Sequence, residues 1–158
     1  MAQRRARSVV ALVFFTCASA AFAQTRGITA EDYFAFDALS DPRFSPDGST
    51  IAFVVTTVDQ TQNRRRSEIR AVPADGSRDT ATLTTAPQSS NTPRWRPDGK
   101  AIAFLSARPA AGDPEAAGST GGGARTQVWL LPLAGGEPVR ITNLLNGVSA
   151  GQWSPVAG

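Results

Sequence analysis

A fifteen-residue pattern occurs twice in this chain, at residues 41–55 and again at residues 92–106. Both copies read Pro-Arg-aromatic, then Pro-Asp-Gly, then a run of apolar residues. A third copy begins at residues 152–155 with Gln-Trp-Ser-Pro and departs from the pattern after that. Repeats at a period of tens of residues are the signature of propellers, solenoids and arrays. The chain is therefore expected to fold as a series of similar units.

Each full copy contains the residues of a tight hairpin turn. Proline pre-sets φ, aspartate accepts a hydrogen bond from a nearby backbone amide, and glycine adopts the left-handed conformation that closes the turn. We predict a structural role, rather than a catalytic or metal-binding one, for six turn residues: Pro46, Asp47, Gly48, Pro97, Asp98 and Gly99.

The sequence around these turns predicts four short strands in each unit. In the first unit, the first strand ends at Phe44 and the other three cover residues 51–55, 67–73 and 81–84. In the second unit, the four strands cover residues 93–95, 101–105, 126–133 and 138–142. Loops are expected at residues 57–66 and at the Gly/Ser-rich residues 107–125. Four short antiparallel strands per unit, repeated, are typical of propeller blades.

The predicted fold is therefore all-β, a partial β-propeller. We expect blade 1 at residues 41–91, blade 2 at 92–149 and the start of a third, truncated blade at 150–158. Propellers close with about four to eight blades, so this chain is expected to form the opening arc of a longer one. The remaining blades are then partners that it requires.

The first 23 residues have the features of a secretory signal peptide. Arg4, Arg5 and Arg7 precede the apolar residues 9–15, and the segment ends in Ala-Phe-Ala. Cleavage is expected between Ala23 and Gln24, which gives an exported protein, periplasmic or secreted, with no membrane attachment afterwards. A twin-arginine signal at Arg4-Arg5 and a lipid-anchor cysteine at Cys17 are the alternatives.

A short helical lead-in is expected at residues 24–40, ahead of the first blade. Thr29 and Asp32 resemble a capping box, with Thr29 at the N-cap. Tyr33, Phe34 and Phe36 supply apolar surface for packing against the blade that follows.

Charge and composition exclude several classes of function. The chain carries 16 basic and 13 acidic residues, and three of the basic ones lie in the signal, so the exported chain is nearly neutral and nucleic-acid binding is not expected. The chain has no histidine, which excludes a Ser-His-Asp mechanism completed within it. We assign no catalytic residue, no metal ligand and no cofactor, and the binding residues are unknown.

Several patterns resemble functional sites but are better explained structurally. Residues 147–151 match the Gly-x-Ser-x-Gly nucleophile elbow, yet no helix follows them and no histidine exists. Asp47, Asp75 and Asp98 are single acids in separate turns, whereas Ca²⁺ needs six or more oxygens. Residues 64–66, three consecutive arginines, are expected to be solvated loop surface. The glycines at 121–123 lack the remainder of a phosphate-binding loop.

The aromatic residues of the three copies have a similar structural interpretation. Phe44, Trp95 and Trp153 recur in register, which indicates packing between blades rather than ligand stacking.

The order of these motifs resembles the start of bacterial prolyl oligopeptidase-family serine peptidases, in the acylaminoacyl-peptidase and dipeptidyl-peptidase branches. The resemblance rests on residues 28–34, on residues 40–48, on the second Pro-Asp-Gly blade and on residues 135–143. It implies a propeller that restricts access to short peptides and covers a C-terminal α/β-hydrolase domain. That domain, which would hold Ser, Asp and His, is a missing partner here, so this chain alone is expected to be catalytically inert. Glu68 and Glu137 have no motif that would assign them to amino-terminus binding.

The Tol-system periplasmic propeller TolB carries similar Ser-Pro-Asp-Gly turns, so a protein-binding or scaffold module of that kind is the alternative. A TolB-like protein would place a separate α/β domain ahead of its propeller. Here only about twenty residues separate the signal from the first repeat. The position of the repeat therefore favours the peptidase.

Overall fold

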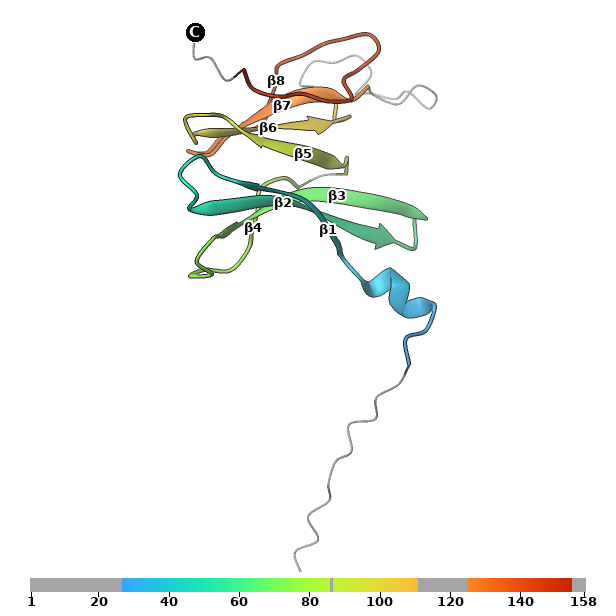
Figure 1. The fold of residues 1–158 in the computed structure, drawn as a ribbon. Helices are drawn as coiled ribbons and strands as arrows, with labels where there is room; N and C mark the ends of the chain where they lie inside the picture. The colour runs from blue at the N-terminus through green and yellow to red at the C-terminus, as the bar shows by residue number, and fades with distance from the viewer. Residues whose placement is uncertain (1–26, 86, 111–124, 155–158) are drawn as a thin grey trace, which may run out of the picture.

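The computed structural model describes residues 27–85, 87–110 and 125–154. Eight strands form two four-stranded antiparallel sheets, stacked one on the other in Figure 1. The first sheet has the order β1-β2-β3-β4 and the second has the order β5-β6-β7-β8, so each strand pairs with its neighbour along the chain. The expected all-β class and the two four-stranded units are confirmed.

The two sheets have matching sets of strands. The first sheet contains β1 (Ala38–Phe44), β2 (Thr50–Asp59), β3 (Arg64–Pro73) and β4 (Ala81–Thr82). The second sheet contains β5 (Ser90–Trp95), β6 (Ala101–Ser106), β7 (Gln127–Pro132) and β8 (Val139–Arg140). Ahead of β1, within the expected lead-in at residues 24–40, lies a short 3₁₀ helix, η1 (Glu31–Ala35). The expected N-cap at Thr29 is wrong, because η1 begins after Ala30 and has no side-chain cap. The Asp32 carboxylate still accepts a hydrogen bond from the Thr29 amide at 2.7 Å.

The expected loop at residues 57–66 is wrong. In the structure β2 continues to Asp59 and β3 starts at Arg64, because Val58 pairs with Arg65 and Asp59 pairs with Arg64 across the ladder. Only residues 60–63 connect the two strands. The fourth strands are shorter than expected, since β4 and β8 are each two residues long.

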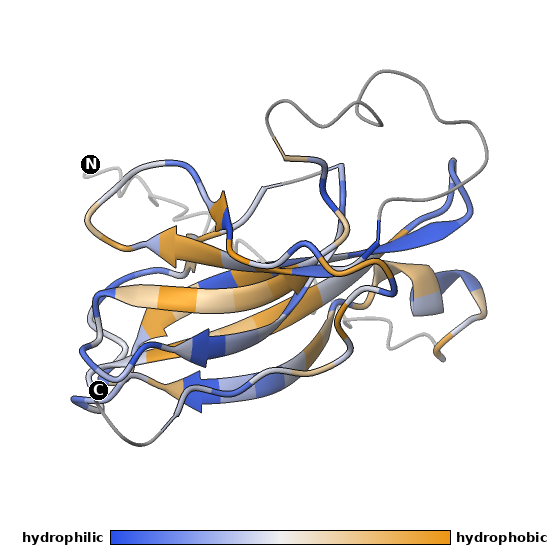
Figure 2. Ribbon diagram, turned by 90° about the horizontal axis from the view of Figure 1, so that it is seen from above, coloured by the Kyte–Doolittle hydropathy of each residue, from blue (hydrophilic) through white to orange (hydrophobic). Residues whose placement is uncertain are grey.

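The core lies between the two sheets. Ala52, Val54 and Ile69 of the first sheet pack against a set of larger side chains from the second sheet: Ile102, Phe104, Trp129 and Leu131. Figure 2 shows hydrophobic stretches on the strands of both sheets, with hydrophilic stretches on strands as well as in turns. Ile69 and Ile102 are fully buried, and Phe104 is 1% exposed. Burial of this apolar surface holds the two sheets together.

We call β1 and β5, the first strand and one edge of each sheet, the inner strands; they share an irregularity. The register of β1 against β2 shifts between Ser40 and Arg43, and that of β5 against β6 shifts between Asn91 and Arg94. Within each bulge one residue has a positive φ, which is 48° at Asp41 and 56° at Thr92. Bulges redirect the side chains beside them. In both strands they redirect the arginine that follows.

Within residues 27–85, 87–110 and 125–154, no helix is long and apolar enough to cross a membrane.

Candidate functional site

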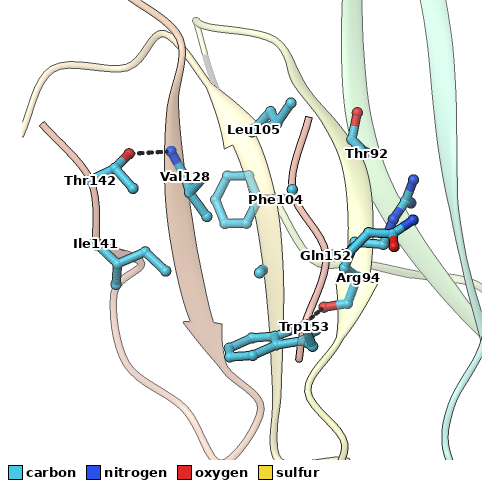
Figure 3. Close-up of a pocket in the computed structure, with 11 residues that line it drawn as sticks. Thr92, Arg94, Phe104, Leu105, Val128, Ile141, Thr142, Gln152 and Trp153 are labelled. Carbon is cyan, nitrogen blue, oxygen red and sulfur yellow. Dashed lines mark hydrogen bonds between the residues drawn. The ribbon is translucent and has the colours of Figure 1, made fainter. Parts of the chain in front are cut away.

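The face of the second sheet that points away from the first sheet carries a mainly apolar pocket, with a volume of about 210 Å³. Figure 3 shows the pocket between β5, β6, β7 and the segment that follows β8. Six residues that form much of its wall are Arg94, Ala103, Leu105, Val128, Ile141 and Trp153. We call this side of the second sheet the open face. Ile141 on it is 50% exposed.

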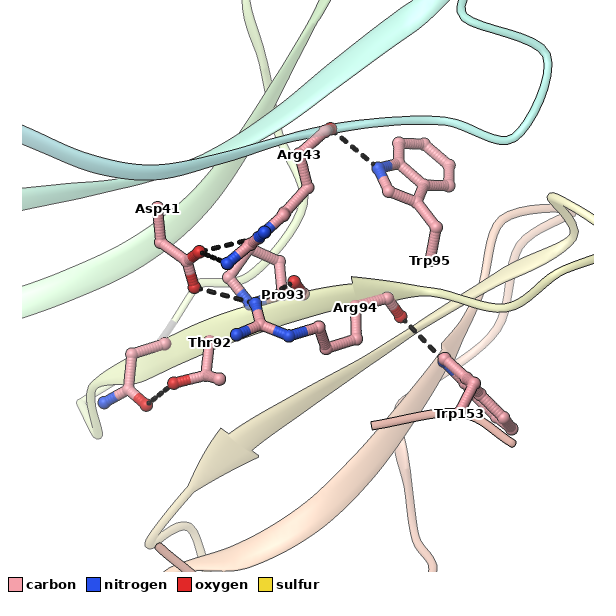
Figure 4. Close-up of polar contacts among 8 residues, drawn as sticks. Asp41, Arg43, Thr92, Pro93, Arg94, Trp95 and Trp153 are labelled. Atoms are coloured by element: carbon pink, nitrogen blue, oxygen red, sulfur yellow. Dashed lines mark hydrogen bonds and ion pairs between the residues drawn. The ribbon is translucent and has the colours of Figure 1, made fainter. Parts of the chain in front are cut away.

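Two tryptophans make the same hydrogen bond in successive units (Figure 4). The Trp95 Nε1–H donates to the carbonyl oxygen of Arg43 in β1 at 2.9 Å. The Trp153 Nε1–H donates to the carbonyl oxygen of Arg94 in β5 at 3.1 Å. Each indole therefore bonds its own unit to the first strand, β1 or β5, of the unit before it.

Of the three repeated aromatic residues, Trp95 packs against the core between the sheets. Phe44 does not occupy such a position. It is 64% exposed, because no sheet among the described residues lies on its side of the first sheet. The expected core role of Phe44 is thus not met within this part of the chain.

A carboxylate of β1 also connects the two sheets. Asp41 accepts hydrogen bonds from Arg43 Nε at 2.7 Å and from Arg94 Nη1 at 2.8 Å (Figure 4). Partial burial acts to raise the pKa of Asp41, but the hydrogen bonds and charges of Arg94 and Arg43 outweigh it and hold that pKa below its usual value. The position of Asp41 in the first motif is taken by Thr92 in the second.

The expected turn residues come together at the outer end of the sheets. Five of the six, Pro46, Asp47, Pro97, Asp98 and Gly99, line one cavity of about 570 Å³, and Gly48 belongs to the same turn as Pro46 and Asp47. Gly48 and Gly99 have φ values of 72° and 70°, the conformation that glycine adopts without strain.

The two turn aspartates are occupied by their own turns. Asp47 accepts hydrogen bonds from the Ser45 hydroxyl at 2.5 Å and the Ser49 amide at 3.1 Å, and these bonds lower its pKa to about 2. Asp98 accepts hydrogen bonds from Arg96 Nε and from the Lys100 amide, which hold its pKa below the usual value. These contacts stabilise the turns, as expected for structural turn residues.

The other patterns of the sequence do not converge on a site. In the described ranges no three His, Cys, Asp or Glu side chains form a group that could hold a metal. In the Gly-x-Ser-x-Gly segment, the Gly147 amide donates to Leu144 O and the Val148 amide to Thr126 O, and no helix follows up to residue 154.

The arginine run and Glu68 form contacts with residues of their own sheet or of the segment before it. The arginine run belongs to β3, where Arg65 donates to the Tyr33 hydroxyl at 3.1 Å and Arg66 lies 3.4 Å from Asp59. Glu68 pairs with Arg70 at 2.5 Å. Glu137 lies in the connection between β7 and β8. The expected cleavage site at Ala23 and Gln24, Arg4, Arg5, Cys17 and the glycines at 121–123 fall outside the described residues.

Sequence reasoning missed the contact between Asp41 and Arg94. The two residues are 53 positions apart, so periodicity within one unit gives no hint of it. One signal was present. The two copies of the motif differ at Asp41 and Thr92, and the arginine at position 94 is replaced by Gln152 in the third copy.

Comparison with known proteins relates this chain to peptidases. No family model matches it. It is 32% identical over 130 residues to the uncharacterized peptidase YuxL of Bacillus subtilis, and the match covers 81% of this chain and 17% of that protein. The chain thus spans less than a fifth of the length of its curated relative.

Solved structures show the same fold. An acylaminoacyl peptidase from Pyrococcus horikoshii matches 77% of this chain and 16% of its own length, with a TM-score of 0.53 and 24% identity. The β-propeller domain of the Trilobed protease from Pyrococcus furiosus, described as having an open velcro topology, matches 75% of this chain and 31% of its own length, with a TM-score of 0.51 and 24% identity.

Proposed function

We propose, from the premise that this chain carries part of a prolyl oligopeptidase-family propeller, that it helps to gate substrate access in an exported serine peptidase that cleaves short peptides. The observation that supports this proposal is the 130-residue relationship to a peptidase, which extends over both repeated units. The matching sheets of acylaminoacyl peptidase agree with the fold that the proposal requires.

In this proposal the chain does not carry out the chemistry. Its sequence contains no histidine, so a Ser-His-Asp triad cannot be completed from its own residues. Catalysis falls to an α/β-hydrolase domain that the related peptidases carry beyond the region matched here. The partners of the chain are therefore that domain, the remaining blades of the propeller and, in the complete protein, a peptide substrate.

Export through the N-terminal signal is part of the same proposal. It rests on the basic residues, the apolar run and the Ala-Phe-Ala sequence of residues 4–23. A periplasmic or secreted peptidase that takes short peptides would need a device that excludes folded proteins. A propeller with a narrow central passage is suited to that task.

The genomic DNA after codon 158 provides the decisive test. The proposal predicts further Pro-Asp-Gly repeats, followed by a Gly-x-Ser-x-Gly motif and then by Asp and His in that order. Their absence from every reading frame would overturn the peptidase assignment. Further repeats with no hydrolase motif would favour the alternative, a TolB-like binding or scaffold propeller.

A biochemical measurement complements the sequence test. The purified chain should not hydrolyse acylaminoacyl or dipeptidyl p-nitroanilide substrates, whereas the complete gene product should. Hydrolysis by the chain alone, retained after removal of contaminating peptidases, would contradict the proposed division of roles.

A further inference from the structure

The inner strands β1 and β5 carry nearly the same motif, but they differ in the residue that each presents to the next unit. The first sheet presents Asp41, which pairs with Arg94 at 2.8 Å across the boundary between the units. The second sheet presents Thr92 at the equivalent position. The residue equivalent to Arg94 in the third copy is Gln152. The charged pair Asp41 and Arg94 at the first boundary therefore corresponds to the uncharged residues Thr92 and Gln152 at the second.

The indole hydrogen bonds show that the two boundaries are built alike. Trp95 reaches the Arg43 carbonyl 52 residues earlier, and Trp153 reaches the Arg94 carbonyl 59 residues earlier. Gln152 precedes Trp153 as Arg94 precedes Trp95. Thr92 and Gln152 both line the pocket on the open face, as Figure 3 shows. The pair Thr92 and Gln152 thus stands where Asp41 and Arg94 stand one unit earlier.

The open face repeats the surface that the first sheet offers to the second. The amides of Ile69 and Val128 are both bonded at 2.9 Å by a threonine hydroxyl, Thr84 in the first sheet and Thr142 in the second. The second sheet covers Ile69 to 0% exposure and Thr84 to 2%. Val128 and Thr142 remain half-buried. The open face is therefore an interface that lacks its second half among the described residues.

We propose that the paired positions 41/94 and 92/152 determine which inner strand docks on which sheet. Asp41 favours docking of the strand that carries Arg94, and Thr92 favours docking of the strand that carries Gln152. The occupant of the open face is accordingly the blade that begins with Gln152 and Trp153. This inference rests on the propeller arrangement in the proposed function, and it is independent of peptidase chemistry.

The alternative occupant is a second copy of the chain, and the same positions do not favour it. Docked in the same way, a copy would bring its Arg43 to Thr92, where no carboxylate takes the place of Asp41. The Arg43 guanidinium of the copy would keep its own Asp41 partner at 2.7 Å and would gain no ion pair across the boundary. Asp41 and Thr92 would thus set the order of the units by favouring one strand over another.

Transplanting the charged pair tests the proposal on the full chain. The variants are Thr92→Asp, Gln152→Arg and their combination. The measurement is the rate at which the indole N–H of Trp153 exchanges with solvent, followed by NMR. The indole of Trp95 serves as an internal reference for the intact boundary. We expect the double variant to exchange about two- to fivefold more slowly than the two single effects combined predict, the range of exposed ion pairs. High salt should remove this gain.

Thr92→Asn combined with Gln152→Arg is the matched control, because asparagine tolerates the same backbone conformation without a charge. The proposal is overturned if the aspartate–arginine combination shows no coupling, or if the asparagine control shows the same coupling. If Thr92→Asp unfolds the chain, the reverse exchange answers the same question. In the Asp41→Thr/Arg94→Gln double variant, the indole N–H of Trp95 should then exchange with solvent more slowly than in Asp41→Thr alone. Equal exchange rates in the two variants would overturn the proposal.

Sedimentation of the wild-type chain tests the second copy as the occupant. Concentration-dependent association that Arg43→Gln abolishes would place a copy on the open face and would overturn the assignment. Association that is absent, or that Arg43→Gln leaves unchanged, agrees with it. None of these results bears on the peptidase assignment, which the sequence after codon 158 tests separately.

Discussion

The indole of Trp95 donates its N–H to the carbonyl oxygen of Arg43, so a side chain of the second sheet is bonded to the backbone of β1 in the first sheet. The same relationship recurs between Trp153 and Arg94. A repeated aromatic residue that seems from the sequence to be only core packing therefore also joins consecutive units through a directional bond.

Replacing Trp95 by phenylalanine, the residue of the first copy, should destabilise the chain by about 1–2 kcal/mol. The change removes the indole donor and leaves the Arg43 carbonyl without this partner, in addition to lost packing. Urea unfolding measures the effect. Trp153→Phe is the matched control and should cost less, because Trp153 ties down only the segment after β8. Equal losses at the two positions would contradict a special role for the boundary between the sheets.

Phe104→Ala should destabilise the chain by about 3–5 kcal/mol, since Phe104 is 1% exposed and central to the core between the sheets. Phe53 is the equivalent residue of the first sheet and is only half-buried on the opposite side. Phe53→Ala should therefore cost clearly less in the same thermal or urea measurement. A similar cost for both would mean that the outer side of the first sheet is also covered in solution.

Acid should loosen the first turn through Asp47. Its hydrogen bonds from Ser45 and Ser49 lower its pKa from 3.8 to about 2 in the folded chain. A depressed folded pKa contributes stability that is fully present above the unfolded value and is lost as the pH falls towards the folded one. Asp47→Asn should therefore flatten the loss of stability between about pH 4 and pH 2 in acid titration. An unchanged slope in Asp47→Asn would contradict this role of the first turn.

Thr92→Asn should stabilise the chain by about 1 kcal/mol. The φ of Thr92 is 56°, a conformation that β-branched residues adopt at a cost and asparagine tolerates. Thr92→Val keeps the branching and should bring no gain. If both variants unfold at the wild-type midpoint, the strain assigned to this bulge is absent in solution.

Signal processing should leave Gln24 as the first residue of the exported chain. Small residues at the cleavage site are required by signal peptidase, so Ala23→Leu should cause the uncleaved precursor to accumulate. Phe22→Leu changes the unrestricted middle position and should be processed normally. Mass spectrometry of the periplasmic and membrane fractions distinguishes the forms. Recovery of uncleaved wild-type chain from the periplasm would disprove the predicted site.

The repeated architecture could be predicted because its signals are local. Pro46, Gly48 and their counterparts encode a turn within a few residues, and the apolar runs that follow them encode strands. The ends of the strands were harder to predict. Three consecutive arginines suggested a loop, but long arginine side chains can lie along a strand with their charged ends in water. Arg66 also has Asp59 within 3.4 Å, on the neighbouring strand.

The contacts between units could not be predicted in the same way. The bond from Arg94 to Asp41 joins residues 53 positions apart, and it depends on the bulges that redirect both inner strands. Within one unit, nothing about an arginine directly after a proline shows which carboxylate it will meet. Only the stacking of the sheets brings that pair together.

The simple strand order within each sheet has a consequence for synthesis. Because β1 to β4 follow one another without crossover, every ladder bond of the first sheet joins residues made within one short stretch of translation. Such local connectivity favours fast formation, and domains tend to form in the order in which they are made. The first sheet can thus be complete while the second is still being translated, and can then serve as the template against which the later strands assemble.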